Sequence, residues 1–414
     1  MTNSCKWRSH GFASNIGMQR FVFARGNARN RLVSRHIKSL GAGLITFSLL
    51  TGTAIASPIS TVFVIAMENH DFTQPSSYTA IQQLYGNTAA PYLNSLITPG
   101  DPNAQYTSYF SNMTNVAPGV HPSEPNYIWE NGGSNFGVFA DNDPSASSHN
   151  IETATSFTGQ LAQKGISWNS YQEDVQYSSS PLVSASGTGG VHNGNTVTQN
   201  PYNGTLQYNY AVKHNPMAFF TDSNTNPAAS RTFAQLQSDI ANNTYAAYNW
   251  ITPDQYNDMH SALNGGFTYK GVTYTGDQAA VAQGDNFLSI LVPELEGTSA
   301  FQNGTAMIEI WDDESEGGDT SAYTIPEIVI SKDAIGNAYD VTEPLTHSAD
   351  LLTNEEIFQT GSCLLAACSS PDLSAAFLPG SIPSSVPEPL SVSIFGVGAV
   401  AAGLFGRRSR RKKQ

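Results

Sequence analysis

Two runs of apolar residues are the clearest pattern in this chain of 414 residues. The run at 61–67 is continuous and rich in β-branched side chains, and the run at 306–311 has one polar interruption. Apolar runs of this length are typical of strands that are buried on both faces. We therefore expect two central strands here, with further strands at 245–251 and 326–330.

Between these strands lie stretches with helical character, at 157–164, 232–241 and 285–291. Strands that alternate with helices indicate an α/β fold with a mostly parallel central sheet and helices on both faces. Two stretches are typical of loop insertions. Residues 178–195 are rich in Ser and Gly and show no regular spacing of hydrophobic residues. Residues 264–277 contain several glycines and are predicted to form a hairpin.

The first 56 residues hold eight Lys/Arg and no Asp or Glu, and they end in an apolar run at 40–50 followed by Ala54-Ile55-Ala56. A basic start, a short apolar core and an Ala-x-Ala site are typical of a secretory signal peptide. The alternative is a membrane anchor, although the apolar run is short for a membrane span. We expect cleavage after residue 56.

The other end carries Pro387-Glu388-Pro389, an apolar segment at 390–406 and six basic residues within 407–413. Physically this is a stop-transfer segment, and an unprocessed tail anchor is the plain alternative. The segment resembles the bacterial Pro-Glu-Pro sorting signal (PEP-CTERM), which implies an exosortase-type enzyme as partner and a Gram-negative cell envelope. We expect a signal peptide at 1–56, a catalytic domain at 57–368, a Pro/Ser spacer at 369–385 and a sorting segment at 386–414.

Without both ends, five Lys/Arg stand against 32 Asp/Glu, which is a formal charge of −27. A body with this charge is not suited to bind nucleic acid through phosphate contacts. It also has hardly any Arg with which to hold an anionic substrate, so divalent metal ions would have to supply positive charge. Its two cysteines, Cys363 and Cys368, favour a disulfide in an oxidising compartment, with metal binding as the alternative.

The segment 121–127 (His-Pro-Ser-Glu-Pro-Asn-Tyr) places Ser123 between two prolines. Proline restricts the backbone, so we expect Ser123 to be held where a loop enters a helix, at a position that favours anions. A hydroxyl fixed there can attack phosphorus if its pKa is lowered. The alternative is that Ser123 is only a helix N-cap, with Pro125 in the first turn.

Ligands of open α/β sheets collect at the carboxyl ends of the strands. Acidic residues follow both central strands, at 68–70 and at 312–316, and Asp258 and His260 follow the strand expected to end near 251. His347 stands before a further predicted helix, which we expect Ser348 to cap. Such acidic clusters can be solvated turns and such histidines can be structural, but carboxylates beside imidazoles are also the ligands of divalent ions.

The order of these motifs resembles a secreted phosphoesterase family that unites bacterial phospholipases C with bacterial and fungal acid phosphatases, within the alkaline phosphatase superfamily. The resemblance spans residues 61–358 and implies an alkaline phosphatase-like fold. The motifs that carry it lie at 68–69, 121–127, 137–142, 167–173, 213–216, 257–260, 313–315 and 347–348.

The resemblance implies roles for individual residues. Ser123 would be the nucleophile that forms a phosphoseryl intermediate, and Asn142 would donate to a phosphoryl oxygen. The metal that activates Ser123 would be held by Glu68, Asp313 and Glu314. Asp312 precedes this pair, so the alignment with the family motif is ambiguous by one residue there.

The remaining implied roles belong to residues around this centre. A second metal site, or the groups that bind substrate and protonate the leaving group, would consist of Asp258, His260 and His347. Asn69 would be a ligand or a phosphate contact. His121 and His214 would support neighbouring groups or contact the substrate.

The resemblance therefore implies a secreted, metal-dependent, acid-phosphatase-like hydrolase of phosphate monoesters, because the 121–127 motif is closer to the acid phosphatase branch. A phospholipase C-type phosphodiesterase is the alternative within the same chemistry. A non-catalytic, acidic envelope protein that binds Ca²⁺ and polysaccharide is the alternative from a different class.

Overall fold

The computed structural model describes residues 59–383, except 79–82, 116–119, 143, 145–150, 176–196, 200–205, 209, 225, 227–228 and 318–321. The predicted signal peptide, the sorting segment and the insertion at 178–195 lie outside the described residues, so they stay predictions. Among the residues described, no helix combines the length and the apolar character that a membrane span requires.

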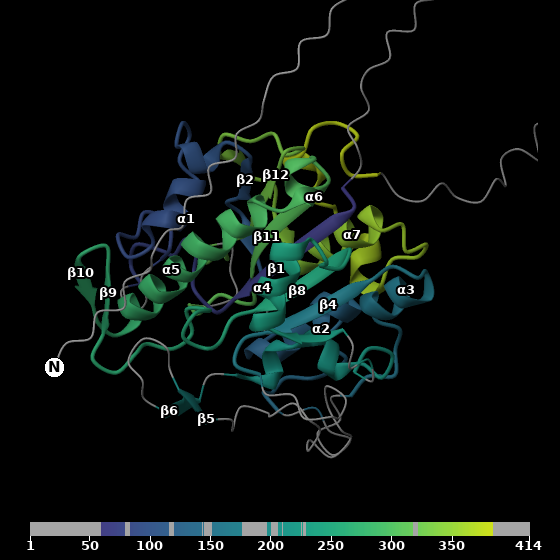
Figure 1. Cartoon of the computed structure of the whole chain (residues 1–414), viewed down its shortest axis with the longest axis horizontal. Helices are drawn as coiled ribbons and strands as arrows, with labels where there is room; N and C mark the ends of the chain where they lie inside the picture. The colour runs from purple at the N-terminus through teal and green to yellow at the C-terminus, as the bar shows by residue number, and fades with distance from the viewer. Residues whose placement is uncertain are drawn as a thin grey trace, which may run out of the picture. The chain divides into compact units, whose positions relative to one another are not determined.

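An eight-stranded sheet forms the centre of the described structure (Figure 1). Its spatial order is β13 (Tyr339–Val341), β2 (Thr107–Phe110), β12 (Ile328–Ser331), β11 (Ala306–Asp312), β1 (Thr61–Met67), β8 (Tyr248–Thr252), β4 (Trp168–Gln172) and β7 (Ser230–Thr232). Strands β11, β1, β8, β4 and β7 run parallel to one another, as do β13 and β2. Only β12 pairs antiparallel with its two neighbours. The predicted mostly parallel sheet is confirmed.

The two apolar runs form adjacent central strands because both faces of each are covered by protein. All seven residues of β1 and all seven of β11 are buried. Alternate residues of β1 enter different cores: Val62 and Val64 pack in one hydrophobic cluster, and Phe63 and Ile65 pack in another. The sheet is therefore the middle of three layers.

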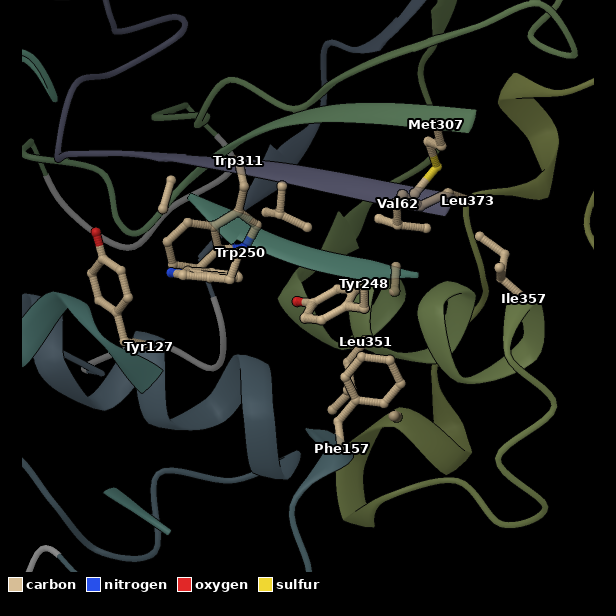
Figure 2. Close-up of a cluster of buried hydrophobic side chains, with 14 of the residues drawn as sticks. Val62, Tyr127, Phe157, Tyr248, Trp250, Met307, Trp311, Leu351, Ile357 and Leu373 are labelled. Atoms are coloured by element: carbon tan, nitrogen blue, oxygen red, sulfur yellow. The ribbon is translucent and has the colours of Figure 1, made fainter. Parts of the chain in front are cut away.

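The helices divide between these two cores. The first core, part of which is drawn in Figure 2, receives side chains of α2 (Ser123–Gly132), α3 (Phe157–Gln163) and α7 (His347–Ile357). The second core receives α1 (Pro91–Leu96), α4 (Phe233–Asn242), α5 (Asp277–Glu296) and α6 (Ser299–Gln302). Helices on both faces of the sheet are thus confirmed.

Short elements complete the described chain. The predicted hairpin at 264–277 is present as β9 (Phe267–Tyr269) and β10 (Val272–Tyr274), and Cys363 and Cys368 form the predicted disulfide. The remaining strands are β3 (Met113–Thr114), β5 (Val197–Gln199), β6 (Leu206–Tyr208) and β14 (Leu345–Thr346). The 3-10 turns are η1 (Pro102–Ala104), η2 (Val212–His214), η3 (Pro216–Phe219), η4 (Leu365–Ser369) and η5 (Ser374–Ala376).

The starts of three helices differ from the prediction. Thr232 is not helical but is the N-cap of α4, where its side chain and that of Gln235 form a capping box. Helix α5 is much longer than 285–291, because it begins at Asp277, directly after the hairpin. Thr346 is the N-cap of α7, so Ser348 lies inside the helix and does not cap it.

We predict that Gly133→Ala destabilises the fold more than Gly165→Ala. Both glycines have positive φ (71° and 70°), which costs another residue about 1–2 kcal/mol. At Gly133, which ends α2, an added Cβ would also overlap the carbonyl oxygen of Leu364, for about 1–3 kcal/mol more. At Gly165 it would meet nothing within 4 Å. Urea unfolding of both variants measures the difference, and equal losses would contradict this account of the α2 terminus.

Candidate active site

The candidate active site lies at the carboxyl ends of the parallel strands β1, β8 and β11. Met67 at the end of β1 is paired with Asp312 at the end of β11. Glu68 and Asp313 therefore leave the sheet side by side, at the edge where α/β sheets hold their ligands. Both side chains are fully buried.

Ser123 is the first residue of α2, and Pro122 is the N-cap. The alternative that Ser123 is itself the N-cap is therefore wrong. The Ser123 side chain is only 2% exposed, and its Oγ donates a hydrogen bond to Glu68 Oε2 over 3.1 Å. A hydroxyl from the N-terminus of α2 thus meets a carboxylate from the end of β1, as the family resemblance implied.

Two further residues lie against the other oxygen of Glu68. Tyr127, one turn along α2, donates from its hydroxyl to Glu68 Oε1 over 2.7 Å. The Tyr127 ring packs against Trp250 and Trp311 of the strands (Figure 2). His214 Nε2 lies 3.1 Å from the same Oε1, and its ring stacks on Tyr127 with centroids 5.0 Å apart. Glu68 is therefore held between the helix and the sheet.

Asp313 is the second centre of contacts. Its Oδ1 accepts a hydrogen bond from the backbone N–H of Asn69 over 2.9 Å, and the Ser123 hydroxyl acts against the rise of the Asp313 pKa. Its backbone carbonyl accepts a hydrogen bond from His347 Nε2 over 2.6 Å. Ser123, Glu68 and Asp313 are thus brought together by the structure.

Asp258 and His260 follow the third strand, β8, and His214 of η2 lies beside them. Asp258 Oδ1 accepts from the His260 backbone N–H over 2.8 Å, and Asp258 Oδ2 lies 3.7 Å from His214 Nδ1. The rings of His214 and His260 have their centroids 6.2 Å apart. Asp258 is fully buried, whereas His260 is exposed at the surface of the site.

Glu314 and Asn142 lie around this centre. Glu314 Oε2 contacts His121 Nδ1 and accepts a hydrogen bond from Asn126 over 3.3 Å. Asn142 is exposed, and its backbone N–H donates to Glu124 Oε2. The ligand and phosphate-binding roles of these two residues stay predictions, as do those of Asn69, Asp258, His260 and His347.

Lys213 is a functional candidate that the sequence prediction did not assign. Its Nζ donates to Asp141 Oδ2 over 2.7 Å, and Asp141 Oδ1 accepts the backbone N–H of Glu124 at the start of α2. The charges of Glu68, Asp141 and Asp313 raise the pKa of Lys213 against the opposing effect of burial. Lys213 adjoins His214 and is one of only five basic residues in the body, which are the two signals that could have identified it.

Several carboxylates are buried together in the site, which makes their ionised forms unfavourable and shifts their pKa values. Burial raises the pKa of Glu68 to about 7, although Lys213 and the Tyr127 hydroxyl act against the rise. Burial, and then repulsion from Glu68, raises the pKa of Asp258 and Asp313 well above the usual range. Burial and the charge of Lys213 lower the pKa of His214 well below its ordinary value.

The donor atoms fit a hard divalent cation. Four carboxylate oxygens of the site are buried without a hydrogen-bond partner: Asp258 Oδ2, Asp312 Oδ1, Asp312 Oδ2 and Asp313 Oδ2. Buried carboxylates need a cation or a proton, and oxygen ligands suit Mg²⁺, Ca²⁺ and Mn²⁺. Within the described part of the chain, however, no group of three ligating atoms within 4.8 Å of one another joins Glu68 to Asp313. The site offers the ligands but does not gather them closely.

Comparison with known proteins identifies related sequences. The sequence model of the Phosphoesterase family matches residues 104–320. An acid phosphatase from Aspergillus fumigatus is 30% identical over 151 residues, which cover 36% of this chain and 30% of that protein. A phosphate-repressible acid phosphatase from Penicillium chrysogenum is 31% identical over 156 residues, which cover 36% of this chain and 32% of that protein. The chain therefore spans about a third of the length of these curated relatives.

Solved structures with a similar arrangement of elements include a protein in the alkaline phosphatase superfamily from Vibrio parahaemolyticus. It has a TM-score of 0.43 and 10% identity, over 79% of this chain and 72% of that chain. A putative sulfatase from Bacteroides thetaiotaomicron has a TM-score of 0.44 and 11% identity, over 80% of this chain and 76% of that chain.

We predict that the ion-free protein loses stability as the pH rises from 4.5 to about 7. Glu68 ionises near pH 4.5 in the unfolded chain but keeps its proton up to about pH 7 in the folded protein. The unfolded state therefore binds fewer protons in this window, and each step in pH favours unfolding, by up to about 3 kcal/mol in total. Thermal unfolding in EDTA at pH 5 and pH 7.5 measures the loss.

Glu68→Gln is the matched control, because its amide cannot ionise. Its stability should fall less over the same pH range than that of the wild-type protein. If both proteins lost the same stability, Glu68 would not be the group responsible.

Proposed function

The chain belongs to the Phosphoesterase family, and from that premise we propose that it hydrolyses phosphate monoesters with Ser123 as the nucleophile. The observation that carries the proposal is the hydrogen bond from Ser123 Oγ to Glu68 at the N-terminus of α2. The family predicted from the sequence motifs is confirmed at this level. The acid phosphatase relatives favour a monoesterase over a phospholipase C-type phosphodiesterase.

The first step transfers the phosphoryl group to the protein. Ser123 Oγ forms a bond to phosphorus while the bond from phosphorus to the ester oxygen breaks. The Ser123 proton is held at Glu68 Oε2, the atom to which Oγ already donates. Tyr127 keeps Glu68 in this orientation through the other carboxylate oxygen.

A divalent metal ion at this centre would be held by Glu68, Asp312 and Asp313, whose buried oxygens supply the donor set. When bound, such an ion lowers the pKa of a hydroxyl and neutralises charge on phosphate oxygens. Asp312 enters this set because the strand register places it opposite Met67, directly before Glu68. Glu314, which contacts His121, is the less suitable member of the Asp313-Glu314 pair.

Positive charge for the phosphate comes from Lys213 and from the start of α2. Asp141 now accepts hydrogen bonds from both Lys213 Nζ and the Glu124 N–H. An anionic phosphate group next to Ser123 would meet the same two donors, since helix N-termini favour anions. Asn142 adjoins Asp141 in the sequence, and its side-chain amide would donate to a phosphoryl oxygen.

The leaving oxygen and the second step need proton carriers near the surface of the site. His260 lies at the exposed side of the site, with its backbone held by Asp258. Burial and the charge of Lys213 lower the pKa of His260 to about 4, so it would protonate the leaving alcohol only at acid pH. Water then attacks the phosphoseryl group and gives a proton to His260, the bond from Ser123 Oγ to phosphorus breaks, and Glu68 returns its proton to Oγ. Inorganic phosphate is the product.

The proposal includes the export of this protein. The basic start with Ala54-Ile55-Ala56 supports a secretory signal peptide, and the Pro-Glu-Pro segment supports an exosortase-type partner at a Gram-negative envelope. The disulfide between Cys363 and Cys368 fits an oxidising compartment.

We predict that Ser123→Ala lowers kcat for p-nitrophenyl phosphate by about 10⁴-fold or more, because loss of a nucleophile cannot be compensated by its neighbours. The control is Ser374→Ala, a change at an exposed serine remote in sequence from the motifs, which should leave kcat unchanged. Full activity in Ser123→Ala would exclude Ser123 as the nucleophile. Faster hydrolysis of bis-p-nitrophenyl phosphate or phosphatidylcholine by the wild type would instead favour the phosphodiesterase.

Lys213→Gln should lower kcat/KM by about 100-fold, because a charged donor to the phosphate is lost from a largely buried site. Steady-state kinetics with the same substrate measures the effect. Lys332→Gln is the matched control, since Lys332 Nζ bonds the backbone of Gln302 at the surface. Equal kinetics in the two variants would remove Lys213 from the site.

A further inference from the structure

A second group of ligating side chains lies between the sheet and helices α2 and α7. Two sets of atoms are gathered there, each within 4.8 Å of one another: Glu130 with His347 and Asp350, and Glu309 with Glu327 and Asp350. Asp350 belongs to both sets. Ligands at about 2.0–2.3 Å from a common ion lie at most about 4.6 Å apart, so each set is close to the spacing that one ion requires.

The group comes from four separate elements. Glu309 is the polar interruption of the apolar run in β11, between Met307 and Trp311 on the face that packs in the first core. Glu327 directly precedes β12, Glu130 lies on α2, and His347 and Asp350 lie one turn apart on α7. Residues three apart on a helix share a face, so both α7 side chains reach the same space.

Every member is buried and has ligating atoms without a partner. Glu309, His347 and Asp350 are 0% exposed, and Glu327 and Glu130 are 1% and 2% exposed. Both carboxylate oxygens of Glu309, Glu327 and Asp350 lack a hydrogen-bond partner, as do Glu130 Oε2 and His347 Nδ1. Unpaired buried carboxylates are among the most costly features a core can have.

No basic side chain offsets this charge in the part of the chain that the structure describes. Burial and the repulsion between the acids raise the pKa of Glu130, Glu309 and Glu327 well above the usual range, and burial alone does so for Asp350. Among the ion pairs of the described residues, none joins a Lys or Arg to any of these four carboxylates. Four protons or two divalent cations would balance the four carboxylates.

The orientation of His347 favours bound cations over protonated carboxylates. Its Nε2 donates to the carbonyl of Asp313 over 2.6 Å, so Nε2 carries the hydrogen of the neutral ring. The other nitrogen, Nδ1, then presents a lone pair, 3.6 Å from Asp350 Oδ2. A ring whose far nitrogen is fixed by a carbonyl is the usual arrangement of a metal-ligating histidine.

We propose that Glu130, Glu309, Glu327, His347 and Asp350 form a buried site for divalent cations, separate from the Ser123 site, with Asp350 shared between two ions. The two sites have no carboxylate in common, because the Ser123 site uses Glu68, Asp312 and Asp313. Its role is structural, because it joins the sheet to α2, which carries Ser123, and to α7. The proposal does not depend on the hydrolase function.

Mn²⁺ is the suitable probe, because it accepts both carboxylate and imidazole ligands. The full chain is loaded with Mn²⁺, dialysed against metal-free buffer and assayed for bound metal per chain. The test variants are Asp350→Asn and Glu327→Gln, and Glu68→Gln reports on the active-site ion. Each substitution keeps the size of the side chain while it removes the charge.

We expect Asp350→Asn to retain at least one Mn²⁺ per chain fewer than the wild type, whereas Glu68→Gln keeps the buried ions. In Glu68→Gln, Mn²⁺ should still raise the unfolding temperature, because an ion that binds only the folded state stabilises it. Equal Mn²⁺ contents in folded wild type, Asp350→Asn and Glu327→Gln would overturn the proposal and leave a protonated acid cluster.

If neither core variant folds, Glu68→Gln decides the question. Retained Mn²⁺ together with a higher unfolding temperature supports the buried site, and the absence of both overturns it. Loss of phosphatase activity in Glu68→Gln bears on the proposed function alone, so failure of one proposal is distinguishable from failure of the other.

Discussion

The burial of carboxylates in a chain with few basic residues is the constraint on which the rest of this structure depends. Glu68, Asp258, Asp312 and Asp313 are all fully buried at the strand ends, and the charge of Lys213 opposes the rise of the Glu68 pKa. Charges in such a place must be neutralised by protons or by cations. The buried carboxylates of the active site therefore destabilise the folded protein when no ion is bound, and they also suit the site to bind metal ions. The predicted loss of stability and the proposed chemistry have the same physical cause.

The sheet makes this arrangement possible because its strands are parallel. The register that pairs Met67 with Asp312 brings the carboxylates that follow β1 and β11 to one edge. Helix α2 then reaches the same edge with Ser123 at its first position and Tyr127 one turn later. Both hydroxyls donate to Glu68, so one carboxylate links the helix to the sheet. The geometry at Ser123 thus follows from packing in the core as much as from the loop before it.

The sequence predicted features that local patterns of residues encode, but not features that depend on packing between distant segments. The apolar runs predicted the central strands, and parallel strand ends then implied that Glu68 and Asp313 lie at one edge of the sheet. That Ser123 joins them was implied by the family resemblance. The bond between Lys213 and Asp141 joins segments 72 residues apart, and no local pattern encodes it. The orientation of His347 was equally inaccessible, because it depends on the Asp313 carbonyl. The polar interruption at Glu309 was visible, but its meaning required the neighbours on α2, β12 and α7.

The central claim is that Ser123 becomes phosphorylated during turnover, and trapping that species tests it most directly. Protein mixed with excess ³²P-labelled phosphate monoester is quenched in acid within milliseconds, and the labelled peptide is identified by mass spectrometry. The account predicts a phosphate ester on Ser123 that disappears when unlabelled substrate is added before the quench. Turnover with no protein-bound phosphate, or a label on another residue, would contradict it.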